Sequence, residues 1–188
     1  MIRRPPRATQ VGSSAASDVY KRQGQVRQPD HRSPAQRLVG VLLVEPGATL
    51  TLRDLTLTGA DVSGDGGAIS SAGRLTLDNV RLIDNSATQG GAVAATGTVR
   101  IDDSHFVGNQ AARGGAISIG AGETLTATTS TFVQNAASVE GGALYLAGSA
   151  TLTDTTGSAN DAPNAGAIRR GTICLGRNAA GRGVRSDA

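Results

Sequence analysis

Short segments in which apolar and polar residues alternate recur along the middle of the chain. Leu50-Thr51-Leu52 and Leu75-Thr76-Leu77 are examples, and residues typical of turns separate one segment from the next. Strict alternation predicts half-buried β-strands, because successive side chains of a strand point to opposite faces. No segment is long enough, or has the 3.6-residue periodicity, to predict a helix. The middle of the chain is therefore expected to be all-β.

Three motifs repeat in register along the same region. The second glycines of the first motif, Gly-Gly-Ala-aliphatic, are spaced 24, 24 and 27 residues apart. Its paired glycines are Gly66-Gly67, Gly90-Gly91, Gly114-Gly115 and Gly141-Gly142, and a degenerate copy of the motif covers residues 165–168. The second motif, a large apolar residue followed three positions later by Asn, ends at Asn85, Asn109 and Asn135. The third is the alternating strand, which begins seven residues before each large apolar residue. Repeats of this length predict a solenoid.

Three short strands in each repeat describe one coil of a parallel β-helix, with about five coils between residues 38 and 168. Coils stack at the inter-strand distance of about 4.8 Å, so equivalent residues lie above one another. The stacked coils bury an apolar core that a single coil cannot bury. Two inward columns are expected, namely Ile69, Val93, Ile117, Leu144 and Ile168, and Leu57, Leu82, Phe106 and Phe132.

The small and amide residues of the motifs have structural explanations. Paired glycines suit a turn that needs positive φ or close backbone approach. The Asn column, continued by Asn160 in the degenerate copy, is expected to stack its amides along the axis, since each amide donates and accepts hydrogen bonds. Two extra residues between Gly115 and Phe132 predict a bulge near residues 120–122.

The pairing of Gly-Gly-Ala-Ile with Phe-x-x-Asn, which is strict at Phe106 and Phe132, resembles the repeat of polymorphic outer membrane proteins. That repeat is a right-handed parallel β-helix of the pectate-lyase-like superfamily. The resemblance covers residues 40–168, with Leu82 and Gly157 in place of Phe in two coils. It implies a secreted or surface-displayed passenger domain, often an adhesin exported by the autotransporter route to the outer membrane. It also implies host-surface proteins or glycans as partners, and further coils in a longer protein.

The two ends differ from the repeat. Residues 1–37 are rich in Arg, Pro, Gln and Ser, and we expect them to be disordered and without the apolar stretch of a signal peptide. Residues 1–23 resemble translated sequencing-adapter read-through, and a genuine basic tail is the alternative. Residues 169–188 are expected to form an irregular tail rich in Arg, Gly and Ala, either a truncated or frame-shifted end or a basic linker.

The net charge of +3 conceals a strong asymmetry. Residues 1–40 carry +6, residues 41–165 carry −7 and residues 166–188 carry +4. The arginines of the acidic middle are scattered and no aromatic residues alternate with them, so nucleic acid is not an expected partner. Cys174 is the only cysteine, and no apolar run approaches the roughly 20 residues of a transmembrane helix.

Asp78 and Asp102, one coil apart, are the best candidates for catalytic carboxylates, with Asp54, Asn79 and Asp103 in the adjacent column. Paired carboxylates cleave glycosidic bonds, and acidic clusters bind calcium. The Gly-His-Gly and Arg-Ile-Lys motifs of galacturonases are missing. We therefore expect these residues to cap turns through backbone hydrogen bonds, with a weak cation site or catalysis as the alternatives.

The sequence thus favours a non-catalytic β-helix rod, secreted or displayed at the cell surface, with an adhesin-like or structural function. It predicts no catalytic residue, no cofactor and no metal site, and assigns a structural role to the repeat residues. The alternative is part of a polysaccharide lyase or glycoside hydrolase whose active coils lie outside this piece. Fold alone does not separate the two functions.

Overall fold

The computed structural model describes residues 37–38, 41–169 and 172–175, which form eighteen strands and no helix. In chain order the strands are β1 (Arg37–Leu38), β2 (Leu42–Val44), β3 (Thr49–Thr58), β4 (Ile69–Ser71), β5 (Arg74–Ile83), β6 (Val93–Ala95), β7 (Val99–Asp102), β8 (His105–Val107) and β9 (Gln110–Arg113). They continue as β10 (Ile117–Ile119), β11 (Thr124–Thr128), β12 (Thr131–Val133), β13 (Ala136–Glu140), β14 (Leu144–Leu146), β15 (Ser149–Thr153), β16 (Thr156–Ser158), β17 (Ile168–Arg169) and β18 (Thr172–Leu175).

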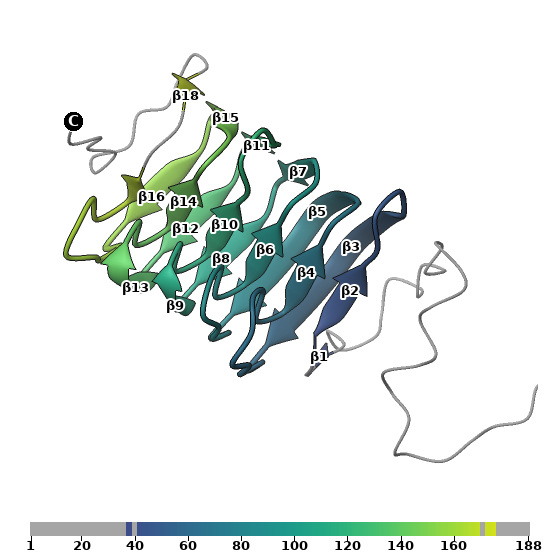
Figure 1. Cartoon of the computed structure of the whole chain (residues 1–188), viewed down its shortest axis with the longest axis horizontal. Coiled ribbons are helices and arrows are strands. Elements are labelled where there is room, and N and C mark those ends of the chain that lie inside the picture. Colours follow the sequence, from purple (N-terminus) through teal and green to yellow (C-terminus); the bar gives the residue numbers. More distant parts are fainter. Residues whose placement is uncertain (1–36, 39–40, 170–171, 176–188) are drawn as a thin grey trace, which may run out of the picture.

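The strands stack in parallel into a solenoid of about five turns (Figure 1). One face is a six-stranded sheet in the order β17-β14-β10-β6-β4-β2. A ten-stranded sheet, in which every pair is parallel, wraps two further sides, and β9 and β13 form a short third sheet. Isolated parallel bridges such as Asp61 with Ser86 extend this third sheet to other coils. The parallel β-helix expected from the repeats is confirmed, and so is the right-handed form that the resemblance implied.

The ten-stranded sheet is bent along one column of residues with positive φ. Five residues, one in each coil, have φ between +46° and +53°, namely Asp54, Asn79, Asp103, Thr129 and Asp154. Asp and Asn tolerate this left-handed conformation better than most residues. β3 and β5 run through the bend as single ten-residue strands, whereas the later coils have two shorter strands there.

Both predicted apolar columns are confirmed. Ile69, Val93, Ile117 and Leu144 are paired in register along the six-stranded sheet, and each is at most 1% exposed. Leu57, Leu82, Phe106 and Phe132 are likewise paired and buried. The two phenylalanine rings stack with centroids 4.7 Å apart and an angle of 11° between the rings. One continuous core therefore runs along the axis of the solenoid.

The inserted residues lie where the spacing placed them. Ala121 and Gly122 form a turn between β10 and β11, and Gly122 has a φ of +82°. The single extra residue before Gly141 gives β13 a register shift against β9, between Ala137 and Glu140. One insertion thus enlarges a turn and the other shifts the register of a strand, and both leave the stacking of the core columns unchanged.

Strand pairing extends past the expected limits of the repeat. Arg37, placed in the N-terminal tail by the sequence, belongs to β1 and pairs with Thr56. The stretch 169–188 was expected to be irregular, but Arg169 lies in β17 and β18 pairs in register with β15. The alternation Thr-Ile-Cys-Leu of β18 accounts for this strand. The other expectations for the two tails concern residues outside the described ranges.

Candidate functional site

The two candidate carboxylates stack in adjacent coils. Asp78 is paired in register with Asp102, on the outer surface of the ten-stranded sheet just before its bend. Asp78 Oδ2 lies 3.2 Å from Arg53 Nε, and Asp102 Oδ2 lies 2.8 Å from Arg100 Nε. A second contact of 3.1 Å joins Arg100 Nη2 to Asp102 Oδ1. Each carboxylate therefore has an arginine partner on an exposed surface.

The adjacent column was expected to cap turns through backbone hydrogen bonds, but its residues instead set the conformation of the bend. Asp54, Asn79 and Asp103 occupy the left-handed bend of the sheet. The amide of Asn79 donates to Asp54 Oδ1 at 2.8 Å, so it bonds to a side chain and not to the backbone. Among the described residues there is no cluster of three or more His, Cys, Asp or Glu that could hold a metal ion.

The capping of the backbone at this bend comes from hydroxyl residues that the sequence analysis missed. Ser104, Ser130 and Thr155 each follow the bend and are buried, and their hydroxyls donate to the carbonyl two residues earlier. Ser104 Oγ also accepts from the backbone N–H of Val80 at 3.1 Å, and Ser130 Oγ accepts from that of Ser104 at 3.2 Å. The hydroxyls therefore form a ladder between coils. A Ser or Thr two residues before the second motif in three coils was the available signal.

Replacement of Ser104 by Ala is expected to lower the free energy of unfolding by about 1–3 kcal/mol. The buried N–H of Val80 would lose its acceptor, and alanine offers no substitute. Ser104→Thr keeps the hydroxyl, as Thr155 does in its own coil, and should be far less destabilising. Urea unfolding of the two variants measures the difference. Equal losses for the two would show that side-chain volume, and not the hydroxyl, matters at this position.

The asparagine column forms the amide stack that the spacing predicted. Asn85 Nδ2 donates to Asn109 Oδ1 at 3.0 Å, and Asn109 Nδ2 donates to Asn135 Oδ1 at 2.9 Å. Asn135 Nδ2 continues the stack to Asn160 Oδ1 at 2.9 Å. The side-chain oxygens of the first three members also accept backbone N–H groups of the preceding coil. Ala60 donates to Asn85, Asn85 donates to Asn109, and Asn109 donates to Asn135. Because Asn85, Asn109 and Asn135 are buried, their hydrogen bonds fix the register of one coil on the next.

The two glycines of each pair serve different purposes. The first, represented by Gly66, Gly90, Gly114 and Gly141, has φ between +59° and +76°. At the second, represented by Gly67, Gly91, Gly115 and Gly142, a Cβ atom would overlap a carbonyl oxygen of the following coil. One glycine therefore supplies the turn conformation, and the other allows close approach of the backbones.

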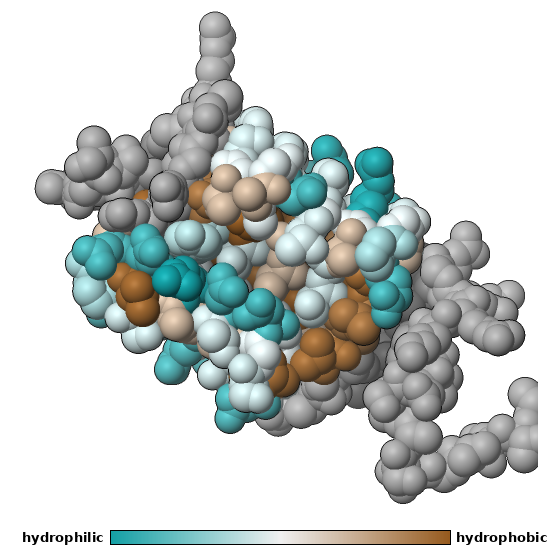
Figure 2. All heavy atoms as spheres, in the orientation of Figure 1, coloured by the Kyte–Doolittle hydropathy of each residue, from teal (hydrophilic) through white to brown (hydrophobic). Residues whose placement is uncertain are grey.

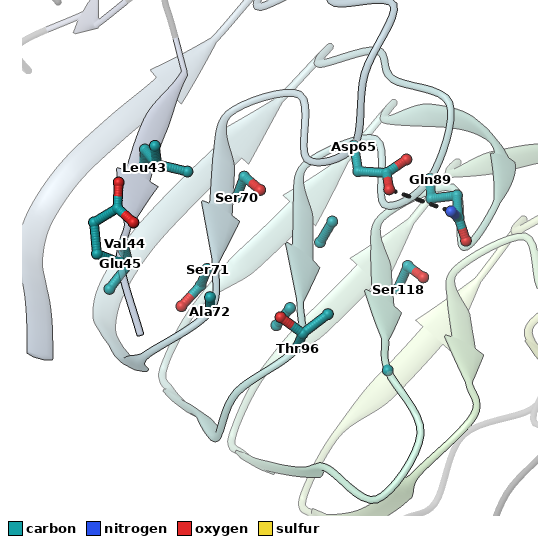
Figure 3. Close-up of a pocket in the computed structure, with 13 residues that line it drawn as sticks. Leu43, Val44, Glu45, Asp65, Ser70, Ser71, Ala72, Gln89, Thr96 and Ser118 are labelled. Carbon is teal, nitrogen blue, oxygen red and sulfur yellow. Dashed lines mark hydrogen bonds between the residues drawn. The ribbon is translucent and has the colours of Figure 1, made fainter. Parts of the chain in front are cut away.

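A shallow hollow of about 190 Å³ lies on the outer surface of the six-stranded sheet (Figure 3). Ser70, Ala94 and Ser118 line it from β4, β6 and β10, and Asp65 and Gln89 stand at one edge with a hydrogen bond of 3.3 Å between their side chains. Figure 2 shows polar and weakly polar surface over much of this side of the rod, with an apolar patch near β2. The hollow has polar groups but holds no arrangement of residues typical of a reaction centre.

The described residues thus define a parallel β-solenoid with an apolar core, two internal polar ladders and repeated outer faces. No helix in the described ranges has the length and apolar character of a membrane span. Comparisons with protein-family models, with curated proteins and with solved structures gave no match. The solenoid architecture is therefore established by the structure itself.

Proposed function

We propose that this protein is a non-catalytic binding or structural rod, secreted or displayed at a cell surface. The observation that carries the proposal is the pairing of Asp78 with Arg53 and of Asp102 with Arg100. The guanidinium groups neutralise the strongest candidate carboxylates, and all four side chains are at least 27% exposed to solvent. Catalytic carboxylates commonly need a shielded environment that tunes their proton affinity.

The outer faces support a binding role. Equivalent residues recur at every coil, so a long partner can make the same contact several times. Multivalent contact of this kind raises overall affinity without a deep pocket. The resemblance to polymorphic outer membrane proteins supports an adhesin-like passenger and glycans or host-surface proteins as partners.

The test compares turnover with binding. Purified protein is incubated with pectin and with polygalacturonate plus calcium, and new reducing ends or unsaturated products are measured. Binding to cell surfaces is measured in parallel. We expect binding without turnover. Activity that Asp78→Ala or Asp102→Ala abolishes would contradict the proposal and favour a polysaccharide-cleaving enzyme.

The same two substitutions are expected to change the free energy of unfolding by no more than about 1 kcal/mol each, because exposed ion pairs contribute little. Thermal unfolding of Asp78→Ala and Asp102→Ala measures the effect, with Asp61→Ala as a control at an exposed aspartate in the bridges that extend the third sheet. A loss of several kcal/mol in either variant, but not in the control, would show that the acidic column holds the coils together.

A further inference from the structure

The hollow on the outer surface of the six-stranded sheet arises from the sizes of one column of side chains. Each three-residue strand of this sheet turns its middle side chain outward, and strand pairing stacks these side chains about 4.8 Å apart. In order along the axis they are Leu43, Ser70, Ala94, Ser118 and Tyr145. The three in the middle are small and the two at the ends are large. The small side chains therefore leave the hollow of about 190 Å³ above them (Figure 3).

Ser118 carries a polar group that the fold itself does not use. Its side chain lines the hollow and is only 8% exposed, and its hydroxyl has no hydrogen-bond partner among the described residues. Its neighbours Ile117 and Ile119 are buried in the core, so Ser118 faces outward into the hollow. The other buried Ser and Thr hydroxyls of the described residues all donate to backbone carbonyls, and they belong to Ser71, Ser104, Ser130 and Thr155. The hydroxyl of Ser118 is therefore available to a ligand.

The rim of the hollow is acidic. Glu45 follows β2 and Asp65 precedes β4, so their exposed carboxylates lie at opposite edges of the parallel sheet (Figure 3). Gln89 Nε2 donates to Asp65 Oδ2 at 3.3 Å, which leaves Asp65 Oδ1 and Gln89 Oε1 as acceptors. None of the described residues that line the hollow is Lys, Arg or His. The hollow thus combines negative charge with several hydrogen-bond acceptors.

One coil further along, the same side of the rod already holds a guanidinium group. Arg113 is the next member of the column that contains Asp65 and Gln89. Its Nε lies 3.3 Å from Glu140 Oε1, and its guanidinium carbon lies 6.0 Å from the centre of the Tyr145 ring. Because these contacts engage Arg113 beyond the hollow, its positive charge does not occupy the acidic rim.

We propose that the hollow binds the guanidinium group of an arginine in a basic segment of a partner protein. Pockets for whole small molecules measure about 300–1,000 Å³, so a hollow of about 190 Å³ suits a single side chain better. A guanidinium has five N–H donors in a planar fork and no acceptor. It therefore matches a site that offers the Asp65 carboxylate, the Gln89 amide oxygen and the Ser118 hydroxyl. The inference rests on the proposed binding function and specifies the chemistry of the partner.

The test measures the affinity of the full chain for a fluorescent hexa-arginine peptide at physiological ionic strength, which screens non-specific attraction. Asp65→Asn removes the charge at the rim, and Ser118→Leu fills the hollow with the side chain that Leu43 presents in the same column. We expect each substitution to weaken binding at least about tenfold, the effect of losing one hydrogen bond to a charged group. Hexalysine should bind more weakly than hexa-arginine, because an ammonium group lacks the planar fork.

Asp61→Asn and Thr156→Leu are the matched controls. Asp61 is exposed and Thr156 is exposed on β16, and neither residue lines the hollow. Both variants should bind hexa-arginine as the parent does, and circular dichroism should show that all the variants unfold at the temperature of the parent. Equal weakening by Asp61→Asn and Asp65→Asn, or no weakening by Ser118→Leu, would overturn the proposal. Binding of neutral cellohexaose that Ser118→Leu abolishes, without binding of hexa-arginine, would also overturn it.

The same variants separate this inference from the proposed function. If the parent binds cell surfaces and neither Asp65→Asn nor Ser118→Leu weakens its binding to cells or to hexa-arginine, the arginine site is wrong and the binding role stands. If the parent binds hexa-arginine through the hollow but binds no cell surface, the role at the cell surface is wrong and the arginine site stands.

Discussion

Asn109→Ala should lower the free energy of unfolding by roughly 3–6 kcal/mol, a large share of the stability of a domain this size. The side-chain oxygen of Asn109 accepts from the N–H and the amide of Asn85, at 3.1 and 3.0 Å. Its amide nitrogen donates to Leu82 O at 3.0 Å and to Asn135 Oδ1 at 2.9 Å. Alanine would leave these buried partners without Asn109, and unsatisfied buried groups are costly. Urea unfolding followed by circular dichroism measures the loss.

Asn164→Ala is the control for this prediction. Asn164 is exposed, and its amide donates to Val139 O at 3.2 Å. There the substitution should lower the free energy of unfolding by less than about 1 kcal/mol, because water can hydrogen-bond Val139 O in place of the lost amide. If both variants lost the same stability, the amide stack would not be what fastens the coils.

The architecture could be predicted because its determinants are local and periodic. Asn85 and Asn109 are separated by as many residues as Gly67 and Gly91, so a single sequence period predicted that both motifs stack in columns. Two of the three extra residues in the 27-residue spacing that ends at Gly142 could be assigned to a turn, because inserted residues leave the inward columns aligned. Register in a parallel solenoid therefore follows directly from sequence spacing.

The polar details were harder to predict because they depend on neighbouring coils. The hydroxyl ladder is hidden in the sequence, since the equivalent residue is Val80 in the second coil and Leu55 in the first. Capping was assigned to Asp and Asn from their general preference for turns, but the bend uses them for their left-handed φ. The register placed Arg53 beside Asp78, but only the side-chain conformations show that the two form an ion pair.

The candidate site illustrates the same limit. Paired aspartates in adjacent coils, such as Asp78 and Asp102, look alike in sequence whether they serve catalysis or the surface of a rod. Proton affinity and reactivity depend on burial and on the nearest charges, which the chain brings together from different coils. The arginine contacts that support a non-catalytic function therefore required the folded structure.

Gly91→Ala is expected to lower the free energy of unfolding by more than about 4 kcal/mol. The variant should therefore lose its cooperative unfolding transition near ambient temperature. A Cβ atom at Gly91 would overlap the carbonyl oxygens of Gly115 and Gln110, and these are backbone atoms that no rotamer change can move. Relief would require separating two coils and breaking the hydrogen bonds between them. Gly64→Ala is the matched control, because a Cβ atom there has no other atom within 4 Å. It should be neutral or stabilise the protein by up to about 1 kcal/mol through a less flexible unfolded chain. Thermal unfolding monitored by circular dichroism compares the two variants. If Gly91→Ala were as stable as Gly64→Ala, close backbone contact would not be the reason for the second glycine of each pair.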